Sequence, residues 1–127
     1  MRILFLVLAV GCAPKKSTPL EEIPKLTKLA DVMDNQAAVA DPLFKKRNQT
    51  AFTDEEFKAM EDASARLQVT APKIKDFTKG PEMTALAEKL LQKAVALGEA
   101  AKAKNVAAAT ALQEMKATCK ECHDKFK

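Results

Sequence analysis

The chain has 127 residues, of which 47% are hydrophobic and 30% are charged, with a formal net charge of +4 at pH 7. Its basic residues do not alternate with aromatic ones, and it has no tryptophan or tyrosine, so the composition argues against nucleic-acid binding. Alanine, leucine, lysine and glutamate dominate and no run alternates as a strand would, which argues against a β architecture and favours an all-α domain.

The first eleven residues are predicted to be a signal peptide. The positive charge of Arg2 precedes an apolar run that ends in small residues, which is the pattern of a secretory signal. The run is shorter than the roughly 20 residues that span a bilayer, so it does not predict a lasting transmembrane anchor. We therefore expect export, with residues 21–127 forming one small domain.

Residues 8–12 resemble the lipobox of bacterial lipoproteins. That resemblance implies that Cys12 is lipidated and becomes the mature N-terminus, and that the protein is anchored to the outer or inner membrane and faces the periplasm. Residues 12–20 would then be the lipidated N-terminus and a short polar tether. An ordinary signal peptide with another cleavage site is the alternative.

The first two predicted helices have clear start or break signals. One runs from about residue 21 to 47, with its regular part beginning near Lys25 because of Pro24, and Pro42 should kink or interrupt it. The next begins at Thr53, which forms a capping box with Glu56 three residues later. The first helix has an apolar stripe of Leu26, Leu29, Met33, Ala37, Ala40 and Phe44.

Two further helices follow. Gly80 and Pro81 open the third, with proline at the first helical position, and Asn105 can cap the fourth. Four amphipathic helices with short connections predict an antiparallel up-down four-helix bundle. Alternating directions bring residues 26–33 of the first helix beside His123 near the end of the fourth.

The chain ends with Cys119-Lys120-Glu121-Cys122-His123 and four further residues. Cys-x-x-Cys-His is the attachment pattern of a c-type haem, and on a helix these three side chains share one face. A thioredoxin-like pair is disfavoured because no βαβ pattern is visible, and a structural zinc site needs four ligands. A disulfide between Cys119 and Cys122 stays open as an alternative.

The alanine-rich stripes of the last two helices leave little apolar surface for a core. A porphyrin between the helices would fill the missing volume, so we expect the apoprotein to be loosely packed and haem binding to stabilise it.

A haem motif at the C-terminal end of a four-helix bundle resembles the cytochrome c′ family. The resemblance implies one covalent haem c between the helices, attached to Cys119 and Cys122, with His123 as the proximal iron ligand. It also implies a distal residue on the first helix. Met33 occupies that position and is the expected distal iron ligand, whereas Leu29, one turn earlier, is the competing distal-pocket residue and would leave the iron five-coordinate.

The leading functional hypothesis is single-electron transfer by a periplasmic cytochrome, with redox proteins as partners. A five-coordinate protein that binds nitric oxide or carbon monoxide is the alternative, and a helical lipoprotein with a disulfide is the third. No second histidine is present, so enzymatic oxygen chemistry is not expected. Lys120, Lys125 and Lys127 could form a basic patch that steers acidic partners. The family resemblance also allows a homodimer, although no exposed apolar stripe commits the chain to one.

Overall fold

The fold is known from a computed structural model, which describes residues 18–126. The predicted signal peptide, Cys12, most of the tether and Lys127 lie outside the described residues. Two short 3-10 helices accompany four long helices, in the order η1 (Leu20–Lys25), α1 (Leu29–Phe44), α2 (Asp54–Lys73), η2 (Ile74–Phe77), α3 (Pro81–Lys102) and α4 (Ala108–Phe126).

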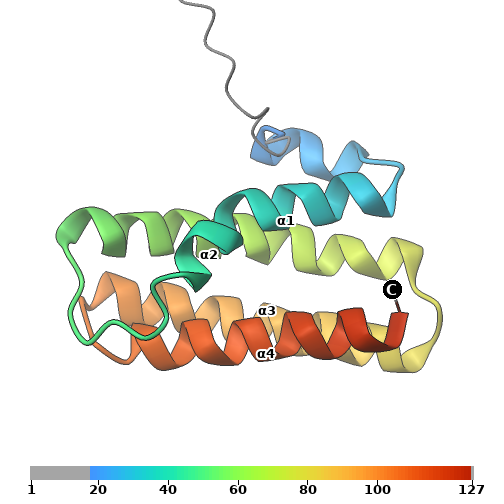
Figure 1. Cartoon of the computed structure of the whole chain (residues 1–127). Helices are drawn as coiled ribbons and strands as arrows, with labels where there is room; N and C mark the ends of the chain where they lie inside the picture. The colour runs from blue at the N-terminus through green and yellow to red at the C-terminus, as the bar shows by residue number, and fades with distance from the viewer. Residues whose placement is uncertain (1–17, 127) are drawn as a thin grey trace, which may run out of the picture.

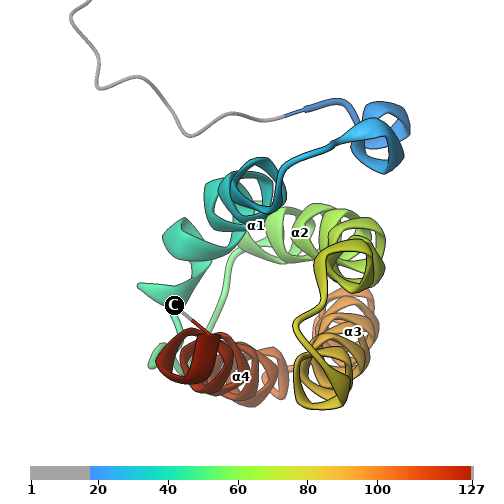
Figure 2. The same cartoon turned by 90° about the vertical axis from the view of Figure 1, so that its right-hand side faces the viewer.

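The four long helices form an antiparallel bundle, as predicted (Figure 1). Seen end-on, they lie in the order α1, α2, α3, α4 around a ring, so the first and last helices are neighbours (Figure 2). The start of α1 and the end of α4 lie at the same end of the bundle (Figure 1). No helix within residues 18–126 is long and apolar enough to span a bilayer.

The predicted start signals of α2 and α3 are confirmed. The Thr53 hydroxyl accepts a hydrogen bond from the Glu56 N–H, and the Glu56 carboxylate accepts one from the Thr53 N–H, which completes the capping box. Gly80 precedes α3 with a φ of 137°, a conformation that residues with a Cβ rarely adopt. Before α4, the Asn105 side chain accepts a hydrogen bond from the Ala107 N–H at 2.9 Å.

The predicted extent of the first helix is wrong. Pro24 lies within the 3-10 helix η1, and the chain is then extended at Leu26 and Lys28 before α1 begins. The helix includes Pro42, whose missing N–H removes one hydrogen bond of the ladder, and ends at Phe44. The regular helix therefore begins four residues later and ends three residues earlier than the sequence pattern indicates.

The end of the predicted tether is held against the bundle. Asn35, which is fully buried in α1, accepts a hydrogen bond from the Thr18 N–H at 2.6 Å and donates one to the Thr18 hydroxyl at 3.1 Å. From α2, the Arg66 guanidinium donates to the Thr18 carbonyl and to the Asn35 side chain. The free part of any tether must therefore end before Thr18.

Candidate functional site

A cavity of about 600 Å³ lies on the α1 and α4 side of the bundle, a volume within the range of small-molecule and cofactor sites. Its wall is mostly apolar, with α1 contributing more than half of its residues and the end of α4 most of the rest. The lining consists of Leu29, Ala30, Met33, Asp34, Gln36, Ala37, Ala40, Asp41, Phe44, Leu67, Lys79, Met83, Cys119, Cys122, His123 and Phe126.

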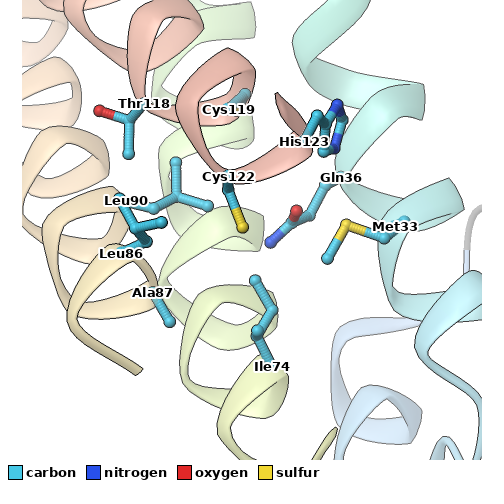
Figure 3. Close-up of a pocket in the computed structure, with 10 residues that line it drawn as sticks. All are labelled: Met33, Gln36, Ile74, Leu86, Ala87, Leu90, Thr118, Cys119, Cys122 and His123. Atoms are coloured by element: carbon cyan, nitrogen blue, oxygen red, sulfur yellow. The ribbon is translucent and has the colours of Figure 1, made fainter. Parts of the chain in front are cut away.

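A smaller cavity, of about 20 Å³, extends the site toward α3, where Leu86, Ala87 and Leu90 form its wall (Figure 3). The two cavities share five lining residues, two on α1 and three on α4: Met33, Gln36, Cys119, Cys122 and His123. The structure therefore brings the predicted haem residues and the predicted distal methionine to one site.

Both cysteines of the motif are free thiols and are half-buried. Burial, together with the neighbouring Cys122 and Asp41, raises the pKa of the Cys119 thiol to about 11. Burial and the charge of Glu121 also raise the pKa of the Cys122 thiol. Both groups are protonated at neutral pH, unlike the low-pKa thiolate of a redox-active pair.

The two predicted axial residues differ in exposure. His123 is exposed, on the last turn of α4, with its ring beside α1 (Figure 3). Met33 is partly buried, and its thioether ends near the Gln36 amide (Figure 3). Leu29, the competing distal residue, lies one turn earlier and lines only the larger cavity.

Gln36 and Lys79 are among the lining residues that were not expected from the sequence. Gln36 is buried, and no apolar pattern marks it because its side chain is polar. Lys79 follows η2 in the connection to α3 and is the lysine that reaches the larger cavity. Lys25 and Lys28, which precede α1, do not line this cavity.

The predicted lysine patch is partly neutralised. Lys120 pairs with Asp124 at 2.6 Å, and Lys125 pairs with Glu82 of α3. Within residues 18–126, no group of three or more His, Cys, Asp or Glu side chains converges as metal ligands would. A zinc site at Cys119, Cys122 and His123 is therefore unsupported, whereas two adjacent thiols, an imidazole and a thioether around an apolar cavity fit a covalent haem.

Comparison with known proteins agrees with this donor set. The sequence model of one family, described as Cytochrome C′, matches residues 24–127, which is most of the chain. No curated protein and no solved structure matches the chain.

Proposed function

The chain belongs to the cytochrome c′ family, and from that premise we propose that it carries single electrons through one haem with His123 and Met33 as axial ligands. Members of the family bind covalently attached haem c and are typically periplasmic haem-binding carriers or ligand-binding proteins, not classical enzymes. The observation that carries the proposal is the shared lining of the two cavities, which places a thioether, an imidazole and two thiols around one space.

Cys119 and Cys122 would hold the haem. Each thiol would add across one vinyl double bond of the haem, with the sulfur bonded to one vinyl carbon and the proton transferred to the other. The two residues are one helical turn apart on α4, and therefore present both sulfurs on one face of the helix. Free thiols of raised pKa are compatible with this addition, which needs reduced cysteines.

His123 and Met33 would complete the iron coordination from opposite walls of the site. His123 comes from α4 and is fixed next to Cys122, whereas Met33 comes from α1. When bound, a haem with histidine and methionine ligands supplies a one-electron couple of raised potential. The apolar wall of α1 and α3 excludes water from the distal side and so favours the less charged state of the site.

Gas binding is the second candidate. Leu29 lines the larger cavity one turn from Met33, and an apolar residue over the iron would leave the sixth position open to nitric oxide or carbon monoxide. The spin state distinguishes the two candidates, because methionine ligation gives a low-spin haem and an open position gives a high-spin haem.

Export, lipidation of Cys12 and anchoring to a membrane remain part of the proposal. The sequence pattern supports them, and the fixed position of Thr18 adds one constraint. At most five residues, 13–17, would separate an anchored Cys12 from the bundle, so the domain would stay close to the membrane surface. Electron exchange would then occur with redox proteins that reach the membrane surface.

The visible spectrum of the reduced holoprotein, before and after addition of carbon monoxide, tests the ligation. We expect a low-spin spectrum that the gas does not change, and we expect Met33→Ala to become high-spin and to bind carbon monoxide. Met83→Leu is the matched control, because Met83 is a second methionine of the same cavity and is read as packing. A Met33→Ala variant that stays low-spin and does not bind carbon monoxide would exclude Met33 as the iron ligand.

A further inference from the structure

Gln36 is buried in the wall of the site with an unused hydrogen-bond donor. Its residue surface is only 7% exposed, and its Nε2 is the single buried side-chain nitrogen or oxygen within residues 18–126 that has no hydrogen-bond partner. A buried amide without a partner destabilises the fold, and such groups are rare enough in native proteins to need an explanation.

The unused donor faces the cavity. Gln36 lines both the larger and the smaller cavity, and its amide extends from α1 toward Cys122 of α4 (Figure 3). Thr118, another buried polar residue of this wall, already has a partner, because its hydroxyl donates to the Glu114 carbonyl at 2.9 Å. A ligand inside the site can therefore satisfy Gln36, whereas the surrounding protein does not.

The position of Gln36 on α1 places the amide near the distal side. Gln36 follows Met33 by three residues, and residues at this spacing have Cβ atoms about 5–6 Å apart on the same helix face. If the Met33 sulfur reaches the iron, the Gln36 amide nitrogen, which is one bond further from its own Cα than the sulfur is, reaches the space beside that sulfur. The Met33 sulfur is only a weak hydrogen-bond acceptor, so it does not satisfy the donor of the Gln36 amide.

We propose that Gln36 is the positioning residue for small ligands at this site, and that its amide N–H donates a hydrogen bond to a diatomic ligand that takes the place of Met33. The inference rests on the haem site proposed above, with α1 on the distal side of the iron. The amide would favour a ligand with an exposed acceptor atom, such as nitric oxide or carbon monoxide, whenever the position of the Met33 sulfur is open.

The test compares the carbon monoxide complexes of two reduced full-length holoproteins, Met33→Ala and Met33→Ala/Gln36→Leu, by infrared spectroscopy. A hydrogen bond to the ligand oxygen draws electron density onto the ligand and weakens the C–O bond. We expect loss of Gln36 to raise the C–O stretching frequency and to make carbon monoxide dissociate about three- to ten-fold faster. Met33→Ala/Thr118→Val is the matched control, and its C–O frequency should not change.

The two readouts separate this inference from the function on which it rests. A C–O frequency that is the same with Gln36 and with leucine overturns the role of Gln36, even when Met33→Ala has become high-spin. A Met33→Ala protein that stays low-spin and does not bind carbon monoxide overturns both the proposed Met33 ligation and this inference. If the wild type is already high-spin, only the ligation fails, and wild type against Gln36→Leu tests the amide directly.

Discussion

The two sides of the bundle are built differently. On one side, α2 and α3 pack more extensively than any other pair of helices. The Ser64 hydroxyl of α2 donates to the Ala94 carbonyl of α3 at 2.6 Å, and Gly98 of α3 lies against Ser64. A Cβ on Gly98 would overlap the Ser64 hydroxyl and lie only 3.0 Å from its Cβ. Small residues here let the two backbones approach closely.

On the opposite side, α1 and α4 are joined mainly at one end. The Gln113 amide of α4 donates to the Arg47 carbonyl just after α1 at 3.0 Å, and the Lys116 ammonium lies 5.4 Å from the centre of the Phe44 ring. Toward the other end the cavity separates the two helices, and α1 contacts α4 far less than α2 contacts α3.

The difference shows how alanine and glycine serve two purposes in one fold. Between α2 and α3 they remove volume so that the helices meet. Along α1, Ala30, Ala37 and Ala40 line the cavity with small side chains, and the apolar wall they help to form is surface that a bound group can cover. One side is closed by the protein alone, and the other would be completed by the proposed haem.

Removal of the attachment cysteines gives the largest expected effect. Cys119→Ser/Cys122→Ser should abolish covalent haem, seen as loss of haem staining on a denaturing gel. It should lower Tm by about 10 °C or more, because a tightly bound group stabilises the fold it completes. Hydrogen exchange should accelerate first in α1, while amides of α2 and α3 stay protected.

The exposed residue between the two cysteines provides the control. Lys120→Ala changes the motif spacer without touching its sulfurs, and should retain full haem staining and the wild-type Tm. Equal loss of protection in all four helices of the double cysteine variant would show that the two sides unfold as one unit, and would contradict the comparison.

Gly98→Ala tests the close packing of α2 against α3, the closed side of the bundle. Alanine is a better helix former than glycine by roughly 0.5–1 kcal/mol, but overpacking against Ser64 costs about 1–3 kcal/mol. We therefore expect Gly98→Ala to destabilise the protein by about 1 kcal/mol in denaturant unfolding, with the haem spectrum unchanged.

Gly98→Ala in a Ser64→Ala background tests whether the contact with Ser64 causes the loss of stability. There the hydroxyl that opposes the new methyl group is absent, so Gly98→Ala should cost clearly less than it does in the wild type. An equal loss in both backgrounds would mean that the close approach of α2 and α3 does not limit the size of residue 98.

The difference between the two sides of the bundle also explains which features the sequence could predict. The apolar stripe of α3 (Met83, Leu86, Leu90, Ala94, Leu97 and Ala101) is buried along its whole length, although its first three members also line the cavities. The predicted stripe of α1 is only partly buried, since Leu29, Met33 and Ala37 face the cavity. Periodicity identifies the side of a helix that faces inward, and does not reveal whether a side chain or a cofactor lies opposite.

The spacing of apolar residues could not predict which polar residues are buried. Asn35 and Gln36 are both buried on α1, yet neither belongs to an apolar row. Their burial depends on distant partners, Thr18 for Asn35 and the cavity for Gln36. The motif at Cys119, Cys122 and His123 was readable because its chemistry is encoded by adjacent residues.

The smallest expected effect concerns the place where the open side joins the closed side. Glu56 at the start of α2 accepts hydrogen bonds from the Thr53 N–H and the Gln49 amide, and pairs with Lys46 at 3.0 Å. The Thr53 backbone bond, with help from Lys46 and Gln49, lowers the Glu56 pKa from 4.5 to about 2. These contacts tie the chain that leaves α1 to the first turn of α2.

A carboxylate whose pKa is lowered in the folded state stabilises the fold above its unfolded pKa, and this contribution disappears as the pH falls through the folded value. In the wild type, the Glu56 contribution should therefore be complete above about pH 4.5 and lost progressively toward pH 2. Glu56→Gln should lower Tm slightly at pH 7 and show a shallower decline in acid, so that the two Tm curves converge near pH 2. Parallel curves would mean that the carboxylate charge does not stabilise this junction, and that the chain after α1 is fixed to the closed side by the Thr53 cap alone.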